Sequence, residues 1–145
     1  MAVNPAGFVL VMDGGAPSYI GGKAMEVISG GQFVFVSGAS DAVSSGANSY
    51  AATDLTFSKA ASGAQCTGVA VSNVESGADV TVCTRGTIIA RANGTVTAGY
   101  VQTVDGNEAV ANAGSVAANL SAQLPIGRAV TTATSGGYCI LRLNL

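Results

Sequence analysis

Side chains that could carry out chemistry are scarce in this chain. Its 145 residues include eight Asp or Glu, six Lys or Arg, three Cys and no His. The lack of His removes the commonest general base and the commonest metal ligand. The acidic residues fall beside expected turns, as Glu75 and Asp79 do, where an Asp side chain caps the turn. A carboxylate pair for glycoside hydrolysis is the alternative, but there is no Trp to line a sugar cleft. We therefore predict no enzyme activity, no cofactor, and no catalytic, cofactor-binding or metal-ligating residue.

The three cysteines, Cys66, Cys83 and Cys139, are widely spaced, and no Cys-x-x-Cys pair occurs. That spacing does not favour a structural zinc site. Cys139 alternates with Leu141 and Leu143 in the closing apolar run, which places the three on one face of a strand. We interpret the cysteines as buried or half-buried free thiols that pack and do not react.

The charge pattern excludes several classes of partner. Only 10% of the residues are charged and the net charge is −2, so no basic surface for nucleic acid is expected. The apolar run at residues 8–12 is far too short to span a bilayer, and we predict no membrane partner. Four arginines fall in or next to expected strands, and we interpret them as solvated outward positions, with ion pairs between subunits as the alternative. These are Arg85, Arg91, Arg128 and Arg142.

The elements that would position these residues are short strands. Twenty glycines separate runs of alternating apolar residues, as at residues 32–37 and 138–144. Asn93-Gly94 and Asp105-Gly106 each predict a hairpin turn between flanking strands. Residues 38–66 are compatible with a long loop, a short helix or a hairpin, and residues 107–124 with a short helix or a loop. The expected fold class is mainly β, a small barrel or sandwich of eight to ten short strands with at most one or two short helices.

The chain also repeats itself. Gly68 aligns with Gly127, and Ser76-Gly77 aligns with Ser135-Gly136, each 59 residues apart. Upstream, the run that begins at Gly31 aligns with the run that begins at Gly99. We predict that the barrel is built from two related halves, since such self-similarity marks duplication. We divide the chain into an N-terminal arm, residues 1–25, and one β-rich domain, residues 26–145.

The order of these pieces resembles a known family. SGGQFVFVSGAS, then TGVAVSNVESGADVTVCTRGTIIARANGTVTAGYVQTVDG, then LPIGRAVTTATSGGYCILRLNL resembles the capsid decoration, or cement, proteins of tailed viruses of the lambda type. Thr97-Ala98-Gly99 and Ile126-Gly127-Arg128-Ala129 stand at two of the family's motif positions. The resemblance covers roughly residues 27–145.

The resemblance implies a β-tulip fold that assembles as a homotrimer on the outer face of an icosahedral capsid. It implies the major capsid protein as partner, synthesis in the host cytoplasm, and a place on the capsid exterior of a bacteriophage virion, where the protein stabilises the head. The family's N-terminal arm adds a strand to the capsid protein. The alternative is another virion β-module from a tail, baseplate or adhesin. The matching candidates for a capsid-docking arm are Phe8, Val9, Leu10, Val11 and Met12.

Overall fold

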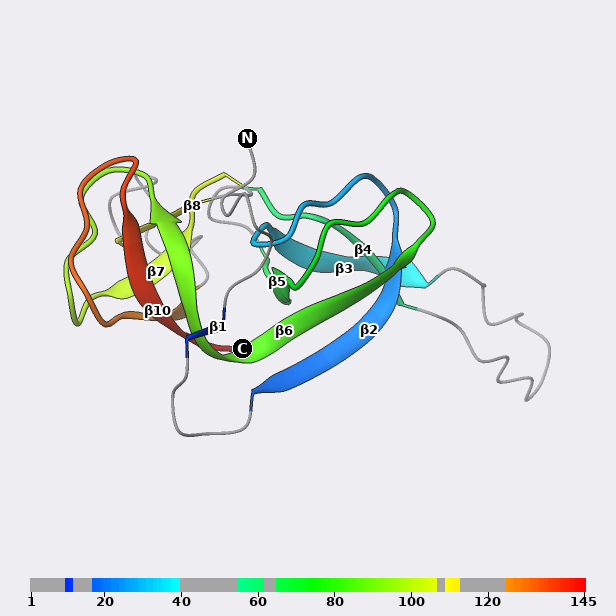
Figure 1. The fold of residues 1–145 in the computed structure, drawn as a ribbon, viewed down its shortest axis with the longest axis horizontal. Helices are drawn as coiled ribbons and strands as arrows, with labels where there is room; N and C mark the ends of the chain where they lie inside the picture. The colour runs from blue at the N-terminus through cyan, green and yellow to red at the C-terminus, as the bar shows by residue number, and fades with distance from the viewer. Residues whose placement is uncertain (1–9, 12–16, 40–54, 62–64, 107–108, 113–124) are drawn as a thin grey trace.

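The structure is a computed structural model that describes residues 10–11, 17–39, 55–61, 65–106, 109–112 and 125–145. This part of the chain is all β, and it contains no helix that could cross a membrane. The predicted fold class, a small barrel of short strands in two related halves, is confirmed. The ten strands of Figure 1 are β1 (Leu10–Val11), β2 (Ser18–Ala24), β3 (Phe33–Ala39), β4 (Leu55–Lys59), β5 (Gly68–Ala70), β6 (Asp79–Ala92), β7 (Val101–Val104), β8 (Ala109–Asn112), β9 (Pro125–Ala129) and β10 (Tyr138–Asn144).

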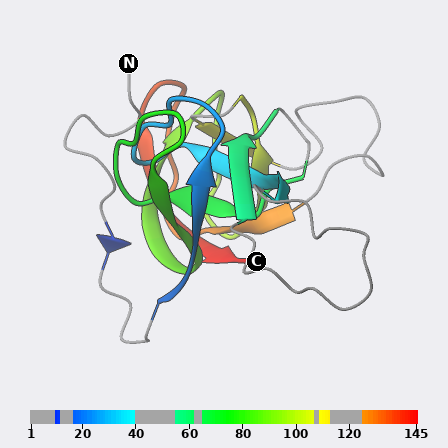
Figure 2. The ribbon, with the colours of Figure 1, turned by 90° about the vertical axis from the view of Figure 1, so that its right-hand side faces the viewer.

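The strands close into two five-stranded barrels that share β6. In the first barrel the ring of hydrogen-bonded neighbours is β2, β4, β3, β5 and the first half of β6. In the second barrel the ring is the second half of β6, then β8, β7, β9 and β10. Figure 1 shows the 14-residue β6 running from one barrel into the other, and Figure 2 brings the first barrel to the front. Closure pairs the strand edges that an open sheet would leave exposed.

Hydrogen bonds outside the strands repeat from barrel to barrel. Ala24 N donates to Ala78 O at 2.9 Å, and Ala92 N donates to Gly137 O at 2.8 Å. The isolated bridge between Ile28 and Val74 has its counterpart between Val96 and Ala133. Equivalent positions are 68 residues apart at the start of each barrel and 59 apart at its end, the same two offsets that the sequence repeat shows. The predicted duplication therefore holds in the backbone pairing.

Three of the four pairings predicted from turn residues, and one segment left open, have counterparts in the structure. β5 pairs with β6, β7 pairs with β8 around Asp105-Gly106, and β9 pairs with β10, as the turn residues indicated. The hairpin predicted at Asn93-Gly94 is wrong: the turn forms, but β7 pairs with β8 and β9 instead of with β6. For residues 38–66 the hairpin alternative is correct where the chain is described, because Ala39 pairs with Leu55.

Two further expectations concern the strands that complete each ring. Residues 109–112, at the start of the segment expected to be a helix or a loop, form β8, while residues 113–124 lie outside the described residues. Residues 18–24, the last part of the predicted arm, form β2 and take part in closing the first barrel. In both cases pairing with a neighbouring strand decides the conformation.

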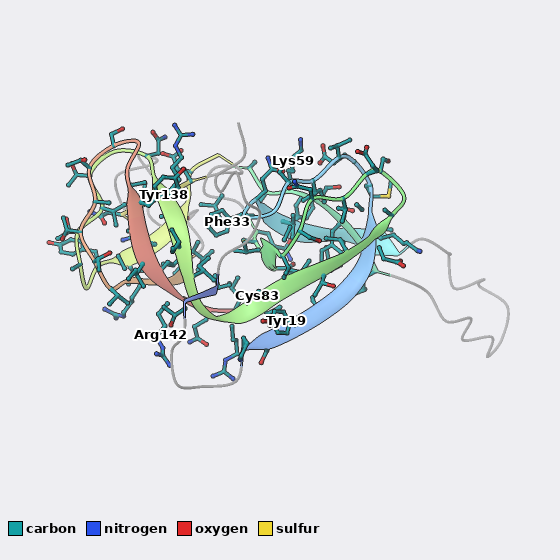
Figure 3. The ribbon with its side chains drawn as sticks, in the orientation of Figure 1. Tyr19, Phe33, Lys59, Cys83, Tyr138 and Arg142 are labelled. Carbon is teal, nitrogen blue, oxygen red and sulfur yellow. The ribbon has the colours of Figure 1, made fainter. Side chains whose placement is uncertain are left out.

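The core has two clusters. One fills the first barrel and includes Val34, Ala70 and Val82. The other fills the second barrel and also contains residues from the first, among them Phe33 and Cys83, which adjoin Val34 and Val82 in sequence. Since successive side chains on a strand point to opposite faces, Phe33 and Cys83 lie on the outside of the first barrel and pack against the second (Figure 3). The two barrels therefore form one packed body.

Candidate docking surfaces

The two described residues of the candidate arm pair with β6 where the two barrels meet. In β1, Leu10 lies opposite Ile88 and Val11 lies opposite Thr87, in antiparallel register. The other three candidates, Phe8, Val9 and Met12, lie outside the described residues. Leu10 and Val11 thus form a strand pair within their own chain, and the role of the arm in docking to a capsid stays a prediction.

Two carboxylates in the described part of the chain pair with lysines. Lys23 Nζ lies 2.5 Å from Asp79 Oδ1, and Lys59 Nζ lies 3.5 Å from Glu26 Oε2. Glu26 Oε1 also accepts a hydrogen bond from the Lys59 backbone N–H at 2.9 Å, which ties it to β4. Within the described ranges no three residues of the types His, Cys, Asp or Glu gather as metal ligands would.

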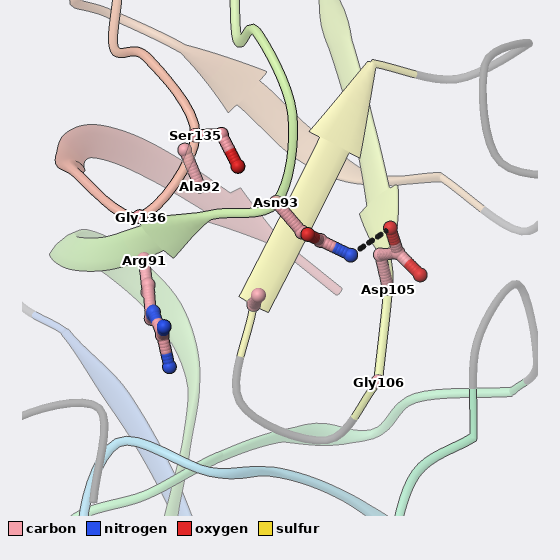
Figure 4. Close-up of a pocket in the computed structure, with 8 residues that line it drawn as sticks. Arg91, Ala92, Asn93, Asp105, Gly106, Ser135 and Gly136 are labelled. Atoms are coloured by element: carbon pink, nitrogen blue, oxygen red, sulfur yellow. Dashed lines mark hydrogen bonds between the residues drawn. The ribbon is translucent and has the colours of Figure 1, made fainter. Parts of the chain in front are cut away.

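One polar hollow of about 430 Å³ lies on the second barrel, where the two predicted glycine turns meet. Asn93 Nδ2 donates a hydrogen bond to Asp105 Oδ2 at 2.7 Å, while the Arg91 guanidinium points away from that pair (Figure 4). Gly94 and Gly106, next to these two residues, have φ values of 84° and 71°, which glycine adopts without strain. The Asn93–Asp105 contact therefore links two turns, and the hollow offers hydrogen-bonding groups without a paired acid and base.

Cys83 and Cys139 are buried, and Cys66 is partly buried. Cys66 Sγ donates to Gly68 O at 3.4 Å, and Cys83 Sγ donates to Arg85 O at 3.2 Å. Burial raises the pKa of Cys66 to about 12, and burial raises the pKa of Cys139 to about 11. Because the thiolate is the reactive form, this agrees with thiols that pack.

We expect the folded protein to react slowly with a thiol reagent at pH 8. With its pKa raised from 9.0 to about 11, Cys139 has a thiolate fraction about 100-fold smaller than that of a free thiol. Mass spectrometry after timed alkylation, with the protein in urea as the control, measures this. Modification of Cys139 at equal rates in both conditions would contradict it.

Comparison with known proteins gives a match at the level of fold. No family model matches the chain, and no curated protein matches it in sequence. A solved structure described as the crystal structure of head fiber gp8.5 N base in bacteriophage phi29 matches with a TM-score of 0.56 and 16% sequence identity. The match covers 89% of this chain and 95% of that one. It shows that the two chains share their fold over nearly their whole length.

Proposed function

We propose that this chain is a structural protein of a tailed-virus virion, which binds the outer surface of the icosahedral capsid as a trimer and stabilises the shell. The observation that carries the proposal is the shared fold with a bacteriophage head-fibre base over 89% of the chain. The sequence resemblance to capsid decoration proteins points to the same particle surface. In this role the chain acts by shape and backbone pairing, and its major partner is the capsid protein.

The physical properties of the chain suit such a role. Two closed barrels, packed against each other, make a stiff body. An arm that adds a strand to a neighbouring sheet gains affinity from main-chain hydrogen bonds and makes little demand on side-chain identity. Many modest contacts on one shell then sum by multivalency.

Another virion β-module is the second candidate, because the matched structure is the base of a fibre. The two roles differ in where the protein sits and what it protects. Purified protein added to expanded shells of the virus that encodes it should bind as trimers and raise the temperature at which the shells rupture. Binding to tails alone, or a monomer that leaves shell rupture unchanged, would overturn the proposal.

The arm gives a specific prediction for this assay. Deleting residues 1–16 removes β1 and leaves β2 intact, so the truncated protein should fold and should bind shells at least about tenfold more weakly, since it lacks the strand proposed to dock. Circular dichroism checks the fold, and co-sedimentation with shells measures binding. Full shell binding by the truncated protein would remove the arm from the docking surface.

A further inference from the structure

Three arginines line up across the outside of the second barrel. Arg128 on β9 lies directly opposite Arg142 on β10. On the other side of β10, Asn144 lies opposite Arg85 of β6. Because Arg142 and Asn144 are two residues apart on β10, they share a face, and Arg85 lies diagonally from Arg142 on that same outer face. All three side chains are exposed. We call this surface the arginine face, and it comprises Arg85, Arg128 and Arg142 together with Val130 and Tyr138.

This arrangement is costly for a chain with so few charges. Directly opposed residues on neighbouring strands have Cβ atoms about 5 Å apart, and like charges there are destabilising. The chain has only six Lys and Arg in total. Both lysines form ion pairs with carboxylates, whereas Arg85 and Arg142 have no ion pair among the described residues, and Arg128 Nη1 donates to the Gly99 carbonyl at 3.1 Å. Half of the cations are thus placed where they repel each other.

The duplication allows the arginine positions to be compared with the equivalent positions in the first barrel. By the offset of 59 residues, Arg128 is equivalent to Val69 and Arg142 to Cys83. Val69 and Cys83 are 1% and 0% exposed, and they pack into the core of the second barrel. These positions therefore form a packing surface in the first barrel. In the second barrel the equivalent positions are exposed, and both carry arginine in place of the apolar residues.

The neighbours of the arginines have the composition of a binding surface. Val130, whose N–H donates to Ile140 O of β10, is 53% exposed, and Tyr138 on the same strand is 46% exposed. Figure 3 labels Tyr138 and Arg142 toward the two ends of β10. Interfaces are enriched in Tyr and Arg around apolar contacts.

We propose that the arginine face is a docking surface for a carboxylate-bearing surface of another protein. Arginine forms paired hydrogen bonds with a carboxylate, and a bound acidic partner would cancel the repulsion between Arg128 and Arg142. A nucleic acid fits less well, because the net charge of −2 opposes a polyanion at long range and Val130 and Tyr138 offer apolar contact. The inference rests on the proposed function in that an acidic patch on the shell would be the natural partner.

The test uses fluorescent poly-L-glutamate as the probe, at about 0.15 M ionic strength, where the Debye length is about 8 Å. The double variant Arg128→Gln/Arg142→Gln should bind the probe at least about tenfold more weakly than the original protein, because two charge-assisted contacts are lost. The matched control Ser72→Asp/Thr95→Asp makes the same change in net charge at exposed loop positions away from the face. It should stay within about threefold of the original protein, because exposed charges farther than a Debye length from the bound probe are largely screened. Thermal melts should show the Gln variant at least as stable as the original protein.

Two further measurements make the result decisive. Equal loss in the Gln variant and the control would overturn the proposal, as would tighter binding of a short DNA duplex than of poly-L-glutamate. Light scattering tests whether a second copy of the chain occupies the arginine face. An oligomer that dissociates only in the Gln variant would assign the face to that second copy and would overturn the proposal of a different protein as partner. No shell enters this assay, so it can fail while the shell-binding result for the truncated protein stands, and the reverse.

Discussion

Gly127→Ala and Gly68→Ala are each expected to destabilise the protein by about 3 kcal/mol, the upper end of the range for overpacking. A Cβ at Gly127 would collide with the carbonyl oxygen of Arg142, and a Cβ at Gly68 would collide with the carbonyl oxygen of Cys83. The two positions are equivalent, and so are the two carbonyl groups, so the same close approach of backbones occurs in both barrels. A backbone carbonyl held in a closed ring cannot turn away as a flexible side chain could.

Urea unfolding measures the loss of stability, and thermal unfolding measures the melting temperature. Gly21→Ala is the control. At Gly21 the nearest atom to an added Cβ is the Val80 carbonyl oxygen at 3.8 Å, an ordinary contact distance. Alanine there should change stability by less than about 1 kcal/mol. The melting temperature of Gly127→Ala should fall by roughly 6 to 12 °C, given a shift of about 2–4 °C per kcal/mol for a chain of this size. Equal melting temperatures for Gly127→Ala and Gly21→Ala would show that the backbones separate easily at this point.

Alternation and turn residues were enough to predict strands, duplication and three of the strand pairs, because these features are local or repeat visibly. What they could not supply is the partner of each strand. Asn93-Gly94 makes a turn, but the strand after it pairs elsewhere, because closing the second ring requires β8 between β6 and β7. Gly21 and Gly22 fall within residues 1–25, the predicted arm. In the structure Gly22 is a point of close approach, since a Cβ there would meet Phe57 Cε2 at 2.6 Å.

The arginine face illustrates the same limit for function. Outward positions for Arg128 and Arg142 follow from the alternation of residues along a strand, as predicted. Their direct opposition follows from the register of β9 against β10, which nothing local to either strand encodes. The meaning of the face comes from its equivalent in the first barrel, where Val69 and Cys83 are buried. Only the fold shows that equivalent positions form an interface in the first barrel and are exposed to solvent in the second.

Deleting residues 1–22 is expected to abolish cooperative folding of the first barrel, while deletion of residues 1–16 leaves it folded. The longer deletion removes most of β2, which pairs with β6 from Ser18 to Lys23 and with β4 through Lys23 and Ala24. Without it, β6 and β4 become open edges, and Ile20 is lost from the first core cluster. Because Phe33 and Cys83 on the outside of this barrel pack into the second core, the second barrel loses part of its own packing as well.

Urea unfolding of the two truncated proteins, followed by near-ultraviolet circular dichroism and hydrogen exchange, separates the outcomes. The protein that lacks residues 1–16 should keep one steep transition and slow exchange at Val80 and Val82, which face the first core. The protein that lacks residues 1–22 should exchange rapidly at both positions and unfold over a broad range. A steep transition at the same urea concentration in both would show that the four remaining strands close without β2, and that residues 17–24 could then belong to the docking arm. Loss of shell binding is evidence about the arm only in the shorter deletion, since in the longer one it would follow from an opened barrel.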